Sequence, residues 1–539
     1  MTEPFNRRQM LGVVPFAALG ISTLSFGASS VSASALQAEL AEDQTLRLAS
    51  WALPTYIRPS NEGGPLSMMT LNTFMSPFYE DEAGTMMPGI CTGWSVSEDG
   101  LIYTLTMDPA ARFSDGTQVT AADLKFSWEY LTWPETASWA SSYLTGPIVG
   151  YAEVVAGSTR ELAGLVVVDD ATLEITLSEP YTPFNKALTL NVGGVVKKEN
   201  VLSGDDWDTN PVCCGPYKLE SWNKDSGELN WVTNEHWWKT PPTIQKINYR
   251  YVQDPNTQGI MYDNNEVDVI QPADILAAQM KVGPNVAELL PIPQGGTVFF
   301  AFDTTRAPFE DANVRRALLK ASDMGTIIQA VFQGGANPAF GLTSPNLAGF
   351  ANPGPYFDPE GAKAALAAST YGSADSLPPI SVRVPTNVTE YVRVAEALQQ
   401  MWKETLGVDV TISLRAQGEE ADDGISQVFR LSFGTLFNDP AVIVAGLGLS
   451  TNSFMVNWVK AQNADLDAIL IDANTRPSEE VEKRIELSQQ AEAMLMEEAY
   501  YIPIIWVEYY FATKPWVNGL KSNSVLSLYT LPEMTISKH

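Results

Sequence analysis

The stretch ISVRVPTNVTEYVRVAEALQQMWKETLGVDVTISL, residues 380–414, decides the class of fold. Its first five and last seven residues alternate apolar side chains with others, which predicts two strands. Between them, residues 389–407 predict an amphipathic helix that ends at Gly407, a residue suited to the left-handed backbone found at helix C-termini. The predicted apolar stripe comprises Val394, Ala397, Leu398, Met401 and Leu406. A strand, a helix and a strand with short joins predict parallel pairing through a right-handed crossover, and hence an α/β fold.

Strands and helices mix elsewhere in the chain in the same way. Residues 101–107 (LIYTLTM) alternate as a half-buried strand does, and residues 164–178 predict two strands around a tight turn at Asp169–Asp170. Two helices are predicted to begin after Thr120 and Asp311, both good N-cap residues, and Asp123 completes a capping pair with Thr120. Their predicted buried residues are Leu124, Trp128 and Leu131, and then Val314, Ala317, Leu318 and Ala321. A last long helix is predicted to begin at residues 477–480, with Ser478 as its cap.

The N-terminus has the three parts of an export signal. Arg7–Arg8 precede a mildly apolar run over residues 13–28, which is too polar to span a bilayer, where roughly 20 strongly apolar residues are needed. Ala33-Ser34-Ala35 follows as a small-residue cleavage site. Residues 1–35 are therefore predicted to be a twin-arginine signal peptide, cleaved after Ala35, and the alternative is an amphipathic N-terminal anchor that stays on. The first ninety residues contain no cysteine for a lipid anchor, so a periplasmic location free of the membrane is predicted.

The remaining chain is large and acidic. Removing residues 1–35 takes away two basic residues and one acidic residue, which leaves a net charge of about −31. Such a surface repels phosphate backbones, so nucleic acid is not expected as a partner. About 500 residues exceed what one hydrophobic core holds, and two or three domains are predicted.

Three cysteines occur, Cys91, Cys213 and Cys214. In an oxidising compartment one disulfide and one leftover thiol are expected, and Cys91 is a better partner than a strained bridge between neighbours. The alternative is three buried thiols that serve as small apolar side chains.

Residues suited to catalysis or metal binding are scarce. The chain has two histidines, His236 and His539, and His236 lies in NEHWWK (residues 234–239), whose aromatic residues favour a packed turn over a catalytic base. No nucleophile elbow, phosphate-binding loop, dinucleotide fingerprint or zinc-ligand spacing is present, so no cofactor is expected. Carboxylates are abundant, and a glycosidase needs two of them, but their abundance is explained by a solvated surface. The protein is predicted not to be an enzyme.

Several motifs in a fixed order resemble the extracytoplasmic solute-binding proteins of family 5, the oligopeptide, dipeptide and nickel receptors of ABC importers. GWSVSEDGLIYTLTMDPAARFSDGTQVTAADLKFSWEYL (residues 93–131) resembles the family's signature stretch. The further matches are NPVCCGPYKLESW (210–222), FFAFDTTRAPFEDANVRRAL (299–318), NADLDAILIDA (463–473) and AYYIPIIWVEYY (499–510). The similarity runs over nearly all of the chain beyond residue 35.

The resemblance implies a two-lobe periplasmic binding protein of the type II-like clamp, with an extra subdomain inserted in lobe one. Lobe one would comprise residues 36–290 with the insert at about 76–205, lobe two residues 291–499, and residues 500–539 would return to lobe one. The implied function is that of an importer's receptor, which captures a short peptide between its lobes and delivers it to the permease subunits. The implied state is a monomer.

The sequence departs from the family's pattern near the expected ligand. In peptide-binding relatives an aspartate ahead of an Asp-Pro dipeptide in lobe two commonly pairs with the peptide's amino terminus. Leu436 stands at that position here, so the anchor is missing or has moved to Asp439. The family's early Leu-Asp-Pro is Ile57-Arg58-Pro59 in this chain. These changes weaken an ordinary peptide assignment and leave room for an oligosaccharide, an opine-like solute or another amphiphile.

By position in the resemblance, the ligand-facing candidates form three groups. Backbone hydrogen bonding is expected from 51–53 and 434–436, polar recognition from Asn438, Asp439 and Asn457, and stacking from two tryptophans. The residues are Trp51, Ala52, Leu53, Gly434, Thr435, Leu436, Asn438, Asp439, Asn457 and Trp458. A nickel ligand is disfavoured because histidine is scarce. A carboxylate-based hydrolase and a chaperone-like surface protein remain as alternatives from other classes.

Overall fold

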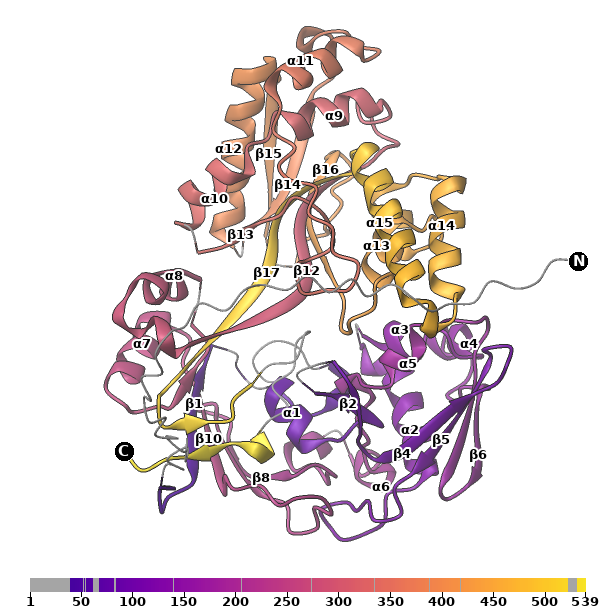
Figure 1. Ribbon diagram of the computed structural model, residues 1–539, viewed down its shortest axis with the longest axis vertical. Coiled ribbons are helices and arrows are strands. Elements are labelled where there is room, and N and C mark those ends of the chain that lie inside the picture. The colour runs from indigo at the N-terminus through magenta and orange to yellow at the C-terminus, as the bar shows by residue number, and fades with distance from the viewer. Residues whose placement is uncertain are drawn as a thin grey trace, which may run out of the picture. The chain divides into compact units, whose positions relative to one another are not determined.

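The strand-helix-strand unit predicted from residues 380–414 is present in the computed structural model (Figure 1). β14 (Ile380–Pro385) and β15 (Val410–Arg415) pair in parallel, and α12 (Thr389–Leu406) lies between them in the sequence. The helix ends at Gly407, whose φ of 77° is left-handed, as predicted. β14 also pairs in parallel with β16 (Val428–Gly434), and the α/β class is confirmed.

The structure describes residues 39–51, 53, 55–61, 67–81, 84–138, 140–204, 206–272, 274–333, 335–386, 388–416, 418–521 and 531–539. The predicted signal peptide (1–35) and Ala52 lie outside these residues. Residues 40–539 form one compact unit. Within the described residues, no helix has the length and apolar character that crossing a membrane requires.

One mixed sheet of eleven strands runs through this unit (Figure 1). Its order is β15-β14-β16-β12-β17-β11-β1-β10-β9-β8, and β13 pairs with β17 off this path. The strands not yet given are β1 (Thr45–Ser50), β8 (Tyr217–Asn223), β9 (Glu228–Thr233), β10 (Lys246–Tyr251), β11 (Val269–Ile270), β12 (Leu289–Phe302), β13 (Asn337–Pro338) and β17 (Tyr501–Thr513). β12 and β17 have 14 and 13 residues, and they join the two halves of the sheet.

We call the half that contains β11, β1, β10, β9 and β8 lobe one. It includes a second sheet in the order β4-β5-β7-β6, formed by β4 (Cys91–Val96), β5 (Ile102–Met107), β7 (Thr172–Thr176) and β6 (Leu165–Asp169). α2 (Ala121–Thr132) follows the predicted capping box of Thr120 and Asp123 and buries the predicted stripe. The shorter elements of lobe one are α1 (Ser67–Thr73), α3 (Ser141–Leu144), α4 (Tyr151–Val155), α5 (Phe184–Ala187), α6 (Lys198–Val201), α7 (Pro255–Asp263), α8 (Asp274–Val282), β2 (Phe78–Glu80), β3 (Met86–Pro88), β18 (Val517–Asn518) and β19 (Thr535–Ile536).

We call the half that contains β15, β14 and β16 lobe two. Its helices besides α12 are α9 (Ala312–Lys320), α10 (Met324–Phe332), α11 (Pro359–Ala368), α13 (Val442–Gly448), α14 (Ala464–Thr475) and α15 (Val481–Glu497). Asp311 caps α9 as predicted, and the predicted buried residues of that helix are buried. The predicted Ser478 cap is wrong. Residues 478–480 form a 3-10 turn and no side chain caps α15, because Ser478 already lies inside the helical run.

The three cysteines are buried free thiols, so the predicted pairing of Cys91 is wrong and the alternative holds. Cys91 contacts the sulfur of Met107 on the neighbouring strand. The thiol of Cys213 lies 3.5 Å from the carbonyl of Tyr217, and that of Cys214 lies 3.7 Å from the carbonyl of Val195. Each thiol therefore fills its own place in the core.

Candidate functional site

β12 and β17 are the strands that connect the lobes, and their pairing changes register on the way. Leu289–Pro293 pair with Glu508–Ala512, and the register shifts between Pro293 and Thr297, so Thr297 pairs with Trp506. Gly296 lies opposite Gly434 of β16, where a β-carbon built on either glycine would come within 3.4 Å of the other glycine's Cα. This irregular stretch, residues 293–297, is the place where the lobes meet.

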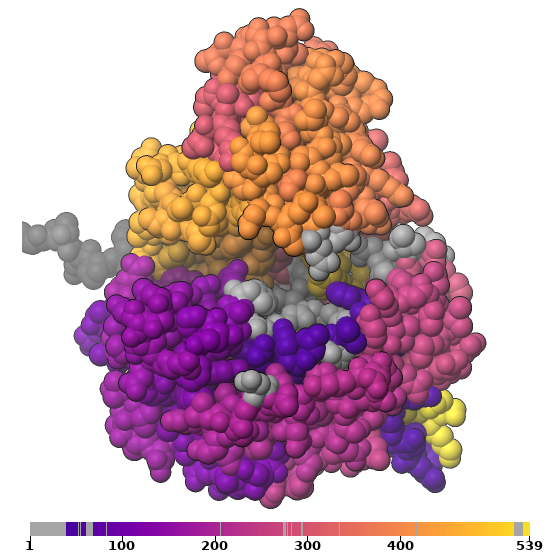
Figure 2. Space-filling model, turned by 180° about the vertical axis from the view of Figure 1, so that it is seen from behind, coloured from indigo at the N-terminus to yellow at the C-terminus, as the bar shows by residue number. Residues whose placement is uncertain are grey.

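The carboxyl ends of the parallel strands in both lobes point toward this stretch. In lobe one, β1 runs parallel to β10 and β11, and β11 runs antiparallel to β17. The carboxyl ends of β1 and β11, at Ser50 and Ile270, therefore lie nearer to the register shift than their amino ends do. In lobe two, Gly434 ends β16 opposite Gly296, whereas Val428 begins it opposite Phe302. Ligands of open α/β sheets lie outside the carboxyl ends of such strands. Figure 2 shows the surface hollowed between the orange residues of lobe two and the indigo and magenta residues of lobe one.

The predicted segment 434–439 begins at the carboxyl end of β16 and is held rigidly by its own hydrogen bonds. The N–H of Thr435 donates to the carbonyl of Gly295 at 2.7 Å, and its hydroxyl donates to the carbonyl of Phe437 at 2.7 Å. The carboxamide oxygen of Asn438 accepts from the N–H of Ala348 at 2.8 Å. Thr435 is buried, whereas Leu436 and Asn438 are partly exposed.

Asp439 lies beneath this segment in a buried ion pair. Its carboxylate accepts from the guanidinium of Arg484 at 2.8 Å, and both side chains are only 4% exposed. It also accepts from the N–H of Ala441, while Arg484 donates to the carbonyl of Ala473. Burial raises the pKa of Asp439, and Arg484 acts against that rise. The hydrogen-bonding capacity of this carboxylate is directed into lobe two.

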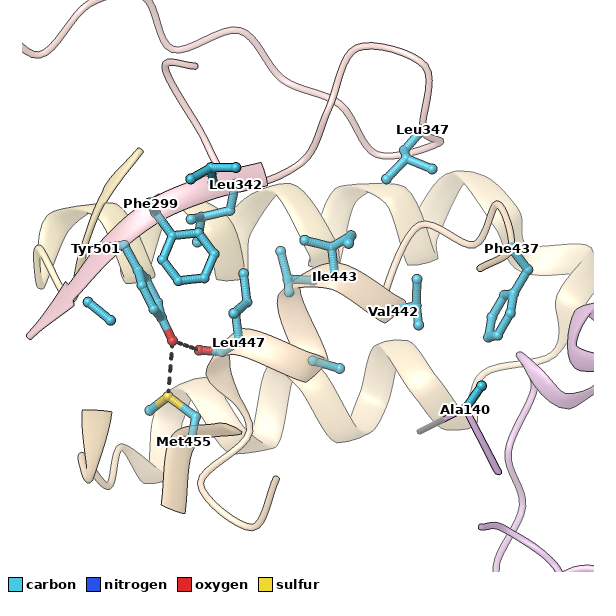
Figure 3. Packing of buried hydrophobic residues seen from close by; sticks show 14 of the residues in the cluster. Ala140, Phe299, Leu342, Leu347, Phe437, Val442, Ile443, Leu447, Met455 and Tyr501 are labelled. Carbon is cyan, nitrogen blue, oxygen red and sulfur yellow. Dashed lines mark hydrogen bonds between the residues drawn. The ribbon is translucent and has the colours of Figure 1, made fainter. Parts of the chain in front are cut away.

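Tyr143 and Thr182 of lobe one make three hydrogen bonds to lobe two in the same region. The hydroxyl of Tyr143 donates to the carbonyl of Gly434 at 3.4 Å. Thr182 donates its N–H to the carbonyl of Asn474 at 3.0 Å and its hydroxyl to the carbonyl of Arg476 at 2.5 Å. Ala140 of lobe one and Phe437 of lobe two belong to one buried apolar cluster (Figure 3). The 434–439 segment is thus bordered by both lobes.

The other predicted site residues are spread over two places. Trp51 and Leu53 follow the carboxyl end of β1 and are 46% and 50% exposed, as residues available to a ligand should be. Asn457 and Trp458 lie in a short π-helical turn, Met455–Val459, and Trp458 packs against Phe429, with ring centroids 5.2 Å apart. Phe429 lies five residues before Gly434, roughly 17 Å along the strand. Phe454, which precedes this turn, packs against Phe433 at the end of β16, with ring centroids 5.5 Å apart.

Three groups at this site were not predicted from the sequence. The first is the loop that places Ala348 on Asn438 and Gly349, with φ of 91°, against Pro440. Its signal was the Pro-, Gly- and Asn-rich run over residues 345–355. The second is Arg484, whose position on the buried stripe of α15 with Ser488, Ala491 and Leu495 called for an internal partner. The third, Tyr143 and Thr182, had no sequence signal, because their partners belong to the other lobe.

Metal chemistry finds no support at this site. Over the residues that the structure describes, no group of three His, Cys, Asp or Glu side chains could hold a metal ion. The groups at the site are backbone amides, hydroxyls, one carboxamide and apolar side chains. Such groups can bind a ligand by hydrogen bonds and apolar contact.

Comparisons with known proteins give one consistent result. Residues 85–455 match the model of the bacterial extracellular solute-binding proteins, family 5 Middle. The chain is 29% identical over 521 residues to the periplasmic murein peptide-binding protein MppA of Escherichia coli K12, covering 93% of this chain and 94% of the relative. It is 28% identical over 544 residues to the periplasmic oligopeptide-binding protein OppA of Salmonella typhimurium LT2, covering 97% and 98%. A solved structure of the Escherichia coli murein tripeptide binding protein MppA matches with a TM-score of 0.75 at 28% identity, covering 93% of this chain and 100% of that one.

Proposed function

Because the chain belongs to the family 5 bacterial extracellular solute-binding proteins, we propose that it is the extracytoplasmic receptor of an ABC importer, which captures short peptides between its lobes and delivers them to the membrane permease. The observation that carries this proposal is the convergence of strand carboxyl ends from both lobes on residues 293–297. A ligand bound there contacts both lobes at once. Its binding energy then favours the arrangement in which both contacts exist, which is the state that a permease can distinguish.

The choice of peptides as ligands rests on the relatives. MppA is by name a murein peptide-binding protein and OppA an oligopeptide-binding protein. An extended peptide suits a site at strand ends, because its main-chain hydrogen bonds can alternate with side-chain contacts. Of the predicted site residues, we propose that Trp51, Leu53, Gly434, Leu436 and Asn438 contact the ligand.

A binding screen tests this function directly. Thermal unfolding is followed with di- to hexapeptides and, as a matched control, with cello-, xylo- and malto-oligosaccharides. A bound ligand at a hundredfold excess over its Kd adds about 2.7 kcal/mol to stability, so a peptide ligand is expected to raise Tm while the sugars do not. A sugar response with no peptide response would contradict the peptide assignment. Product formation from any ligand over hours would contradict the receptor role.

We further propose that the protein reaches the periplasm through a twin-arginine signal, is cleaved after Ala35 and works as a monomer without a lipid anchor. The paired Arg7–Arg8 and the Ala33-Ser34-Ala35 site support export, and the periplasmic relatives support the destination. Replacing both arginines with lysine is expected to keep the unprocessed chain in the cytoplasm. The proposed lobe boundaries remain 36–290, 291–499 and 500–539, with the insert at about 76–205.

A further inference from the structure

Residues 434–438, which we call the wall of the candidate site, carry no charged side chain. The wall comprises Gly434, Thr435, Leu436, Phe437 and Asn438, none of which ionises. The next residue, Asp439, is the nearest carboxylate in the sequence, and it is buried in its pair with Arg484. Of the side chains in this wall, those that reach solvent are the apolar Leu436 and the carboxamide of Asn438.

The neighbouring charges are also compensated. Lys186 of lobe one is a second cation that acts electrostatically on Asp439. Its ammonium pairs with Glu80 at 2.7 Å and donates to the carbonyl of Gly84 at 2.9 Å. Tyr181 interacts electrostatically with both Asp439 and Arg484. Its phenol is neutral because burial raises its pKa far above the physiological range. Arg484 and Lys186 therefore each have their own anion.

A charged peptide end would be poorly accommodated here. An ammonium or a carboxylate that enters a closed cleft loses its hydration, and that loss is offset only by a close opposite charge with good hydrogen bonds. The chain's net charge of −30 attracts cations at long range, but salt screens this attraction over about 10 Å at 0.1 M, so it cannot replace a contact ion pair. An amide group, by contrast, needs only the hydrogen-bond partners that a strand end provides.

Resting on the proposed role as a peptide receptor, we infer that the ligand is a peptide whose end against residues 434–438 carries no charge. An N-acylated peptide or a C-terminally amidated peptide has this property. The substrate class is thus narrower than short peptides with two free ends.

The test is calorimetric titration of one peptide sequence in four forms: free, N-acetylated, C-amidated and blocked at both ends. At least one singly blocked form is expected to bind tenfold tighter than the free form, and that form identifies the end that lies on this wall. Free peptide binding as tightly as every blocked form would overturn the inference while sparing the proposed function. The absence of saturable binding by all forms of every peptide tried would overturn the proposed function and the inference with it.

A pair of variants at Leu436 isolates the charge. Leu436→Asp places a carboxylate on the partly exposed side chain of this wall, and Leu436→Asn has nearly the same shape without the charge. Compared with the asparagine variant, the aspartate variant is expected to change affinity at least tenfold for a free peptide. It gains affinity if the amino end lies on this wall and loses affinity if the carboxyl end does, and the form blocked at that end shows no such difference. Equal behaviour of the two variants, with both folded by circular dichroism, would overturn the inference. If the aspartate variant does not fold, the four-form titration of the unaltered protein decides.

Discussion

Asp439 and Arg484 lie 45 positions apart in the sequence and meet as a pair with almost no exposure to water. The pair joins the segment after β16 to α15, and the donation from Arg484 to the carbonyl of Ala473 adds the end of α14. At the scale of single residues, this arrangement explains how a charged side chain next to the cleft can support the site without facing the ligand. Removing one partner would leave the other charge buried and uncompensated.

Asp439→Asn is therefore expected to lower the free energy of unfolding by about 3–5 kcal/mol, measured by urea denaturation, because Arg484 loses its counter-charge. The control is Asp409→Asn, since Asp409 pairs with Lys403 at an exposed position where an ion pair contributes about 0–1 kcal/mol. Exchanging the pair for apolar residues, Asp439→Leu with Arg484→Met, is expected to recover most of the loss. If Asp439→Asn lowers the free energy of unfolding no more than Asp409→Asn does, the ion pair of Asp439 and Arg484 does not stabilise the segment after β16.

At the scale of elements, the turn between β15 and β16 gives a measurable titration. Asp423 accepts hydrogen bonds from the N–H groups of Ile425 and Ser426 and from the hydroxyls of Ser413 and Ser426. Burial by itself would raise the pKa of Asp423, but these hydrogen bonds stabilise the carboxylate more strongly and bring the pKa to about 2. The turn is thus held by an ionised group.

Because the folded pKa is depressed, the stabilisation from Asp423 is present above the unfolded value near 4 and is lost as the pH falls through 2. Denaturant midpoints between pH 5 and pH 2 are expected to fall less steeply for Asp423→Asn than for the unaltered chain, because the variant has already lost this contribution. Identical slopes for the two proteins would show that the carboxylate titrates normally. A carbon-13 titration of the Asp423 carboxyl gives the pKa directly.

The elements that the sequence predicted well are those whose signals are local. Periodicity and capping residues located α2, α9, α12 and the parallel strands around α12, but they placed the buried face of α12 imperfectly. Val394 and Leu398 are buried as predicted, whereas Tyr391, Ala395 and Trp402 are buried and were not predicted. The indole of Trp402 donates to the carbonyl of Leu318 in α9 and to Ser322 just beyond that helix, and the position of α9 against α12 cannot be read from the apolar period of α12.

The candidate site was predictable to the same degree and for the same reason. The segments at 51–53 and 434–439 follow strands, so their location at carboxyl ends follows from the α/β pattern. The partner of Asp439 lies 45 residues away in the sequence, and the packing of Trp458 against Phe429 depends on the direction of side chains around β16. Those are tertiary properties with no local signal.

At the scale of the whole molecule, the lobes are joined by two kinds of contact. Paired strands β12 and β17 pass from one to the other, and Tyr143 and Thr182 of lobe one donate hydrogen bonds to Gly434, Asn474 and Arg476 of lobe two. The strand pair has register shifts between Pro293 and Thr297 and between Val298 and Phe299, where its ladder is interrupted. The second set is made of a few hydrogen bonds, so a ligand that contacts both lobes can alter how often these bonds are formed.

Ligand binding is therefore expected to reduce the radius of gyration measured by small-angle X-ray scattering, because a ligand that touches both lobes adds its binding energy to the contacts around Thr182. Thr182→Val, which removes the hydroxyl donor but keeps the N–H, is expected to leave the unliganded chain more expanded and still compacted by ligand. A peptide that produces no thermal shift is the control and should leave the scattering unchanged. An unchanged scattering curve at saturation with a tightly bound ligand would contradict closure of the lobes, because the ligand would then bind without moving them.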